Sequence, residues 1–233
     1  MGEVRNPCIA SIFMKNIDQR TAELQSAVVK KFNKSNIEHY PVLTEMPPGY
    51  TMDKLVDMLE QKGHDAIMFL DIDCVPVNSI ALDYFFEQAY AGKVIGDAQR
   101  SNHIQNDQHI FAAPHNVTFT IETYRKCGNP SFLPNARGDV AEELTFRAEE
   151  SNIPVEIIMP LRFDAPPIRM AWETDATPYW ALADGMPGYG IGTTFGFSDE
   201  SGAASDLFWH NYQIFHPGQQ ERFWKKCEEL LNG

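Results

Sequence analysis

The sequence has few basic residues and no long apolar run. Acidic residues number 32 against 19 Lys and Arg, which gives a formal net charge of -13, and the basic residues are scattered along the chain. Such a surface repels nucleic-acid phosphates, so we expect no broad nucleic-acid-binding face. No segment reaches the roughly 20 apolar residues of a membrane span, and the start of the chain lacks the basic and apolar regions of a signal peptide. We therefore expect a cytoplasmic protein without a membrane partner.

Cysteine is also scarce, and its spacing does not suit metal binding. The four cysteines lie far apart and form no CxxC pair, at Cys8, Cys74, Cys127 and Cys227. This argues against both a zinc ribbon and a disulfide framework, and we expect all four to be reduced. The composition, 43% hydrophobic and 22% charged, is that of an ordinary globular protein. A chain of 233 residues is long enough for a sizeable core, and we expect one domain over residues 1–233.

What the sequence does contain is a regular alternation of strand and helix patterns in its first hundred residues. Short apolar runs predict strands, and apolar residues at helical spacing predict helices. The expected order is strand, helix, strand, helix, strand, helix, strand, over residues 8–13, 18–34, 37–44, 51–63, 66–73, 79–92 and 93–98. Thr51 and Ser79 are the expected N-caps of two of these helices. Such alternation favours parallel pairing in an open, doubly wound sheet, whose ligands bind beyond the carboxyl ends of the strands.

The second half of the chain alternates less regularly. Apolar runs predict strands at 109–114 and 153–163, and helical spacing predicts helices at 139–151 and 219–231. The glycine-rich stretch at 185–197 lacks the glycine order of a nucleotide-binding motif, and no strand leads into it. We interpret it as a mobile loop near a site.

Two aspartates, Asp71 and Asp73, close the apolar run in "IMFLDIDCVP". Carboxylates this close at a strand end repel each other unless a cation lies between or beside them. Mn²⁺ or Mg²⁺ would accept their oxygens and bridge to the diphosphate of a nucleotide. An isolated pair of this kind is more often a solvated strand end. A third ligand could come from "LFWHNYQIFH", in which His210 and His216 are each, taken alone, more often packed side chains.

Three segments resemble the metal-dependent GT-A glycosyltransferases. They are "FLDIDCVP" at a strand end, "GNPSFLPNARGDVAEELTFRAEESNIPVEIIMP", and "GYGIGTTFGF" followed by "LFWH". The resemblance covers most of the chain after residue 50. It implies a GT-A-like α/β fold with an open, mostly parallel mixed sheet. Residues 1–100 would form a Rossmann-like, nucleotide-binding half, residues 101–218 a half that receives the acceptor and completes the metal site, and residues 219–231 a C-terminal helix.

The resemblance also implies roles for individual residues. Asp71 and Asp73 would bind Mn²⁺ or Mg²⁺ and the diphosphate of a nucleotide-sugar donor, with His210 as the preferred third metal ligand and His216 as the reserve. The segment after the metal motif would approach the sugar and the acceptor, which suggests Asn102 and His103 as contacts. The end of the first strand would lie near the nucleotide base and ribose, at Asn16.

The family also places an acidic residue at the start of a helix on the acceptor side. Here "GDVAEELTFR" keeps the "ELxxR" end of that pattern but not its "ED" register, so Asp139, Glu142 and Glu143 all remain candidates for the catalytic base. An acceptor hydroxyl needs such a base within hydrogen-bond reach, and a helix N-terminus would favour the ionised form of Asp139. Helix capping accounts for Asp139 equally well, because "DVAE" resembles a capping box.

The expected function is transfer of a sugar, from a UDP-sugar by preference, to an acceptor hydroxyl. Compact enzymes of this kind are found in the cytoplasm of bacteria, and in host cells infected by their viruses. The acceptor would be a glycan, a small molecule or, for a phage enzyme, a hydroxymethylated base in DNA. The acidic surface argues against tight binding to duplex DNA.

Two other functions fit parts of the sequence. "FLDIDCV" also resembles the motif of haloacid-dehalogenase-like phosphatases, in which Asp71 would be the nucleophile and Asp73 the general acid. That motif normally lies on the first strand, Glu143 replaces an expected aspartate, and no lysine motif lies between them. The other alternative is a protein that binds a metal or a nucleotide sugar without turnover.

Overall fold

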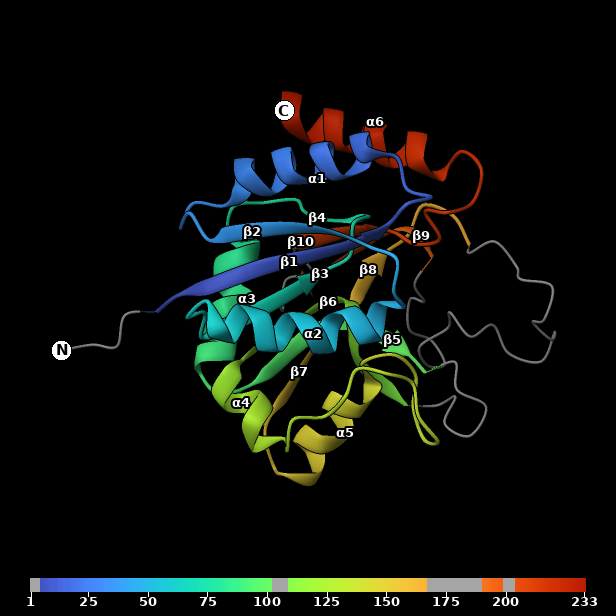
Figure 1. Cartoon of the computed structure of the whole chain (residues 1–233). Coiled ribbons are helices and arrows are strands. Elements are labelled where there is room, and N and C mark those ends of the chain that lie inside the picture. The colour runs from blue at the N-terminus through green and yellow to red at the C-terminus, as the bar shows by residue number, and fades with distance from the viewer. Residues whose placement is uncertain (1–4, 102–108, 167–189, 199–203) are drawn as a thin grey trace.

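The computed structural model describes residues 5–101, 109–166, 190–198 and 204–233 (Figure 1). A six-stranded sheet forms its centre, in the order β2-β1-β3-β6-β5-β7. Its strands are β1 (Pro7–Met14), β2 (Glu38–Thr44), β3 (Ala66–Leu70), β5 (Val94–Arg100), β6 (Ile110–Thr120) and β7 (Val155–Ile158). β1 pairs in parallel with β2 and β3, and β5 with β7, while β6 runs antiparallel to β3 and β5. The α/β class and the open mixed sheet predicted from the sequence are confirmed.

A second, four-stranded sheet has the order β4-β10-β9-β8, and its neighbouring strands are antiparallel. Its strands are β4 (Cys74–Pro76), β8 (Pro160–Arg162), β9 (Ile191–Ser198) and β10 (Ala204–Asn211). β4 follows β3 after a short turn, so the chain passes from one sheet to the other at Asp71 and Asp73. This passage places both aspartates where the two sheets meet.

The interpretation of residues 185–197 as a mobile loop is wrong for the part that the structure describes, because Ile191–Ser198 is strand β9. Its glycines serve close packing instead. A Cβ added to Gly196 would lie 2.1 Å from the carbonyl oxygen of Ser205 on β10. The glycine therefore lets the two strands approach, which a loop interpretation based on composition alone does not foresee. Residues 185–189 lie outside the described residues.

Helices cover both faces of the central sheet. They are α1 (Gln19–Phe32), α2 (Pro48–Gln61), α3 (Ala81–Tyr90), α4 (Ile121–Lys126), α5 (Glu142–Glu150) and α6 (Gln219–Asn232). Successive side chains of a strand point to opposite faces, so Cys8 and Ala10 of β1 pack with α2, α4 and α5, whereas Ile9 packs with α1 and α3. Phe195 and Phe208 of the second sheet join the Ile9 side, so this sheet shares a core with the first.

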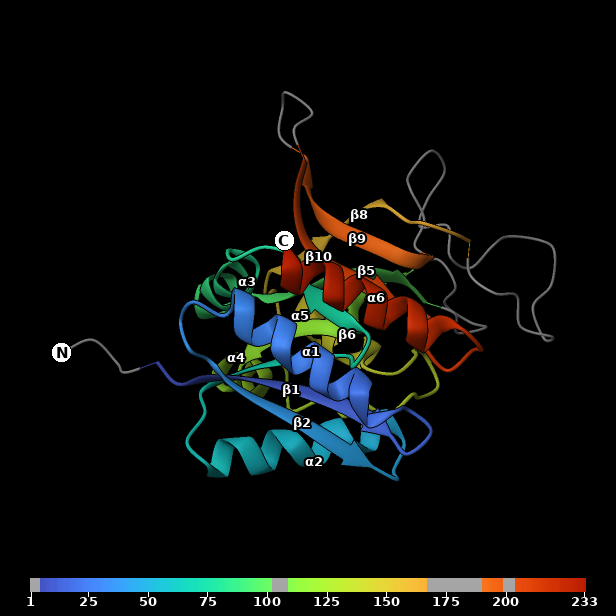
Figure 2. The ribbon, with the colours of Figure 1, turned by 90° about the horizontal axis from the view of Figure 1, so that it is seen from above.

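α6 lies beside α1, as both views show (Figures 1 and 2). Phe223 and Cys227 of α6 pack against Val28 of α1 and Trp209 of β10, which confirms the packed C-terminal helix. All four cysteines are buried and free, as expected. Among the described residues, no helix is both long and apolar enough to cross a membrane.

Three helix starts differ from their predicted positions. α2 begins at Pro48 rather than at Thr51, since proline is tolerated in a first helical turn, where the N–H has no partner. α3 begins at Ala81. The N–H groups of Ile80 and Ala81 donate hydrogen bonds to Asn78 Oδ1, at 2.9 and 3.0 Å, so Asn78 and not Ser79 provides the side-chain contact at this helix start. α5 begins at Glu142, three residues after Asp139.

Candidate metal centre

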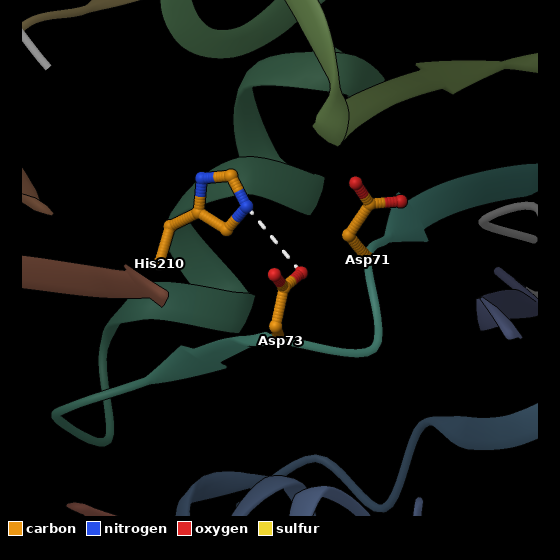
Figure 3. A group of neighbouring side chains, drawn as sticks. All are labelled: Asp71, Asp73 and His210. Carbon is orange, nitrogen blue, oxygen red and sulfur yellow. Dashed lines mark ion pairs between the residues drawn. The ribbon is translucent and has the colours of Figure 1, made fainter. Parts of the chain in front are cut away.

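Asp71, Asp73 and His210 form a compact group between the two sheets (Figure 3). Each offers one ligand atom, and these atoms all lie within 4.8 Å of one another. Antiparallel pairing of β10 with β4 sets His210 opposite Cys74, which brings the imidazole beside the neighbouring Asp73. His210 Nε2 lies 3.4 Å from Asp73 Oδ1. The structure thus brings together the two aspartates and His210, the histidine that the resemblance to GT-A glycosyltransferases favoured as their partner.

Backbone hydrogen bonds hold the turn that carries the two aspartates. Asp71 N donates to His115 O at 2.9 Å, Cys74 N to Asp71 O at 2.9 Å, and Asn211 N to Asp73 O at 2.8 Å. Gln25, fully buried on α1, donates through Nε2 to Asp71 O at 2.6 Å and to Cys74 O at 3.0 Å. The turn is therefore fastened to α1, β6 and β10, which restricts the positions of both carboxylates.

The electrostatics of the group favour a bound cation. Burial, and then the neighbouring Asp73, raises the pKa of Asp71 to about 7, because a second negative charge in a poorly solvated place is unfavourable. Burial lowers the pKa of His210, but Asp73, Asp71 and Asp97 outweigh it and the net pKa lies above the ordinary value. Two carboxylates and one imidazole form a donor set that suits Mn²⁺. A divalent cation held there would relieve the repulsion between the carboxylates.

A cavity of about 330 Å³ opens at the metal centre. Asp71, Asp73 and His210 line it, and so does Asn16, the residue expected near the nucleotide. Its volume falls in the range of about 300–1,000 Å³ typical of ligand pockets. Gln99, Tyr212 and Phe215 also line this cavity, which therefore combines polar groups with an aromatic wall.

Asp71 also lines a smaller cavity of about 220 Å³, and so does Asp139. Asp71 and Pro114 border both cavities. Asp139 does not open α5 but lies before it, where its N–H donates to Glu142 Oε2 at 2.7 Å. The spacing of this bond is that of a capping box, but the N-cap of α5 is Ala141, so the bond closes the turn before the helix and does not cap it. Asp139 is thus held in the turn before α5 and lines a cavity that Asp71 also lines.

The other two acidic candidates point elsewhere. Glu142 is fully buried and accepts hydrogen bonds from Ser101 Oγ at 2.7 Å and from Asp139 N at 2.7 Å, and His109 Nδ1 lies 2.6 Å from its Oε1. Glu143 pairs with Arg137, at 2.7 Å between Oε1 and Nη2, and with Arg147. Arg137 lowers the pKa of Glu143 to about 2. Of the three candidates, Asp139 is the one that lines a cavity shared with Asp71.

The reserve ligand His216 does not join the metal group, which consists of Asp71, Asp73 and His210 among the described residues. Its ring lies against Phe215, with 4.6 Å between the ring centroids. Asn102 and His103 lie outside the described residues.

Sequence reasoning missed two buried residues behind the metal centre. Asp97 of β5 is fully buried and accepts a hydrogen bond from Asn116 Nδ2 at 2.9 Å, and burial raises its pKa to about 8. His115 of β6 stacks on His210, with 4.2 Å between ring centroids. A charged residue inside the apolar run "KVIGDA" was the available signal for Asp97. The predicted strand at 109–114 stopped one residue before His115.

No family model matches the sequence, and no curated protein matches it. Several solved structures are similar in fold. A Drosophila galactosyltransferase in complex with manganese, UDP-Gal and xylobiose is 11% identical, with a TM-score of 0.47 over 66% of this chain and 65% of that chain. A nucleotide-diphospho-sugar transferase from Desulfovibrio desulfuricans is 6% identical, with a TM-score of 0.46 over 67% of this chain and 80% of that chain. A cytidylyltransferase from Leptospira borgpetersenii is 14% identical, with a TM-score of 0.41 over 66% of this chain and 76% of that chain. These likenesses concern the fold alone.

Proposed function

We propose that this protein is a metal-dependent glycosyltransferase, which moves a sugar from a nucleoside diphosphate donor to an acceptor hydroxyl. The observation that carries the proposal is the convergence of Asp71, Asp73 and His210, whose ligand atoms lie within 4.8 Å of one another, at a cavity of about 330 Å³. This cavity lies beyond the carboxyl end of β3, where open α/β sheets bind their ligands. The donor that we propose first is a UDP-sugar.

Asp71, Asp73 and His210 would hold Mn²⁺ or Mg²⁺. The ion, when bound, supplies positive charge against the departing diphosphate, where negative charge grows in the transition state. Asn16, which lines the same cavity, would contact the nucleotide through its amide. The backbone bonds that fasten the aspartate turn keep its carboxylates in place without rearrangement during the reaction.

Asp139 is the residue that we propose as general base. It lines the smaller cavity, which Asp71 also borders, and we propose that the acceptor hydroxyl enters this cavity. The base takes the hydroxyl proton as the bond to the anomeric carbon forms. The acceptor would be a glycan, a small molecule or a hydroxymethylated base in phage DNA, and the net charge of -13 favours the first two over duplex DNA.

Release of nucleoside diphosphate tests the proposal. Wild-type protein with Mn²⁺, a panel of UDP-sugars and an acceptor mixture should release UDP, and Asp73→Asn should lower that release at least about 100-fold, because it removes a charged metal ligand. Asp57→Asn, on the exposed side of α2, is the matched control and should act as wild type. Equal release by wild type and Asp73→Asn would overturn the proposal.

The same protein samples separate the two alternatives. A phosphatase of the haloacid-dehalogenase type would form a phosphoryl or beryllofluoride adduct on Asp71, and mass spectrometry that finds such an adduct would replace the transferase proposal. A protein that binds without turnover would take up Mn²⁺ and UDP but release no UDP from any donor.

A further inference from the structure

Strand β6 has an irregular pairing with β5 next to the proposed metal centre. Its pairing with β5 matches Gly96 to Val117 and then Ala98 to Ala112, so residues 113–116 of β6 lie opposite Asp97 alone. We call residues 113–116 the β6 bulge. Bulges are frequent beside active sites, where they redirect a side chain. His115 lies in this bulge and lines the cavity of about 330 Å³ together with Asp71, Asp73 and His210.

Close packing against β5 shapes the bulge. A Cβ added to Gly96 would lie 2.8 Å from Ala112 Cβ and 2.8 Å from Asn116 O. Ala112, which precedes the bulge, and Asn116, which ends it, therefore pack closely against β5 at a position that has no side chain. Asn116 Nδ2 donates to Asp97 Oδ2 at 2.9 Å. The bulge is therefore fastened at its base, and its protruding residues have a defined position.

His115 touches two of the three residues of the metal group. Its backbone oxygen accepts the N–H of Asp71 at 2.9 Å. Its ring lies nearly parallel to that of His210, at 4.2 Å between centroids and 13° between planes. Phe195 lies against the same ring at 5.3 Å, and His115 is only 3% exposed, so the ring has little room to turn.

Metal-binding histidines are usually oriented by a hydrogen bond from their second ring nitrogen. Among the residues that the structure describes, Nδ1 of His210 has no hydrogen-bond partner, and it is buried. In place of such a hydrogen bond, the ring of His115 stacks on one face of the His210 ring. Nε2 of His115 in turn lies 3.8 Å from Oδ2 of the buried Asp97.

We propose that His115 is a positioning residue for the metal centre: its carbonyl oxygen fixes Asp71, and its flat ring fixes the plane of His210. This inference rests on the proposed function, because it takes Asp71, Asp73 and His210 to be metal ligands. A flat ring at position 115 is what the role requires, while the polar edge of that ring is dispensable.

Affinity for Mn²⁺, measured by isothermal titration calorimetry, tests the proposal. His115→Leu keeps the volume but removes the flat ring, and it should weaken Mn²⁺ binding 10- to 100-fold, the range typical of changes behind metal ligands. His115→Phe keeps a flat ring and should bind Mn²⁺ nearly as wild type does. His64→Leu is the matched control: it removes another buried imidazole, 5% exposed and in edge-to-face contact with Tyr40, and should not change the affinity.

Two further measurements secure the result. Thermal unfolding shows whether each variant is folded, and His115→Met replaces His115→Leu if that variant is not. NMR of the metal-free protein reports the stack directly, because the ring protons of His210 should be shifted by the His115 ring in wild type and His115→Phe but not in His115→Leu. Wild-type affinity in His115→Leu, or an equal loss in His115→Phe, would overturn the positioning role. No Mn²⁺ binding by the wild type would instead overturn the proposed function, and the NMR shifts would still show whether His115 orients His210.

Discussion

At the scale of single residues, the proposed metal centre depends on contacts that lie behind Asp71, Asp73 and His210. Gln25 contributes no ligand atom, yet it bonds the carbonyl oxygens of Asp71 and Cys74 on either side of the aspartate turn. A buried carbonyl group without a donor is unfavourable because it cannot recover the hydrogen bond it had with water. Such residues therefore stabilise the protein and shape the site together.

Replacing Gln25 should affect both properties. Gln25→Met keeps the length of the side chain but removes the two hydrogen bonds, and it should lower the free energy of unfolding by about 1–3 kcal/mol and weaken Mn²⁺ binding. Urea unfolding and calorimetry measure these effects. Gln19→Met, on the exposed side of the same helix, is the control and should change stability by less than about 0.5 kcal/mol. Full stability in Gln25→Met would contradict the prediction.

The ion pairs of Glu143 should give the protein an acid-sensitive contribution to stability. Arg137 lowers the pKa of folded Glu143 from 4.5 to about 2, so the folded state binds the proton less readily than the unfolded state. The stabilisation is complete above pH 4.5 and is lost as the pH falls toward 2. The difference in urea midpoint between wild type and Glu143→Gln should therefore be large at pH 7 and shrink by pH 3. A constant difference would refute this account, and Glu23→Gln at an exposed position controls for general charge effects.

At the scale of elements, apolar periodicity located most strands and helices, while local packing decided their ends. The predicted strand at 37–44 and helix at 18–34 correspond to β2 and α1 within two residues at each end. The glycine-rich segment failed as a prediction because glycine marks both loops and tightly packed strands. In β9 the deciding factor was the neighbouring strand β10, which the local sequence does not contain.

This interpretation of β9 predicts a marked sensitivity at one glycine. Gly196→Ala would place a methyl group 2.1 Å from Ser205 O, which must push β9 away from β10, and should lower the free energy of unfolding by about 1–3 kcal/mol. Ser198→Ala, at the exposed end of the same strand, should change it by less than about 0.5 kcal/mol. Chemical unfolding followed by tryptophan fluorescence compares the two, and equal stability of both variants would show that β9 tolerates the methyl group.

At the scale of the whole molecule, the two sheets meet at the metal centre, so a ligand there should stabilise the folded state as a unit. UDP at 100 times its dissociation constant would add about 2.7 kcal/mol of stability, which for a chain of this size raises Tm by roughly 5 to 10 °C. We expect this shift with Mn²⁺ and its loss after chelation. Asp73→Asn should show no metal-dependent shift. Equal stabilisation by UDP with and without metal would separate nucleotide binding from the metal centre.

Local sequence patterns predicted the strand that precedes Asp71 and Asp73 and most of the helices around it, whereas the preference for His210 over His216 came from the resemblance to GT-A glycosyltransferases. Periodicity and residue chemistry are local properties, and they can be read without knowing the fold. Which of Asp139, Glu142 and Glu143 reaches the cavity beside Asp71 depends on the tertiary structure. Asp139 lines that cavity, whereas Glu142 contacts His109 and Glu143 pairs with Arg137 and Arg147. The role of His115 likewise follows from a bulge between paired strands, and no pattern along a single strand encodes such a pairing.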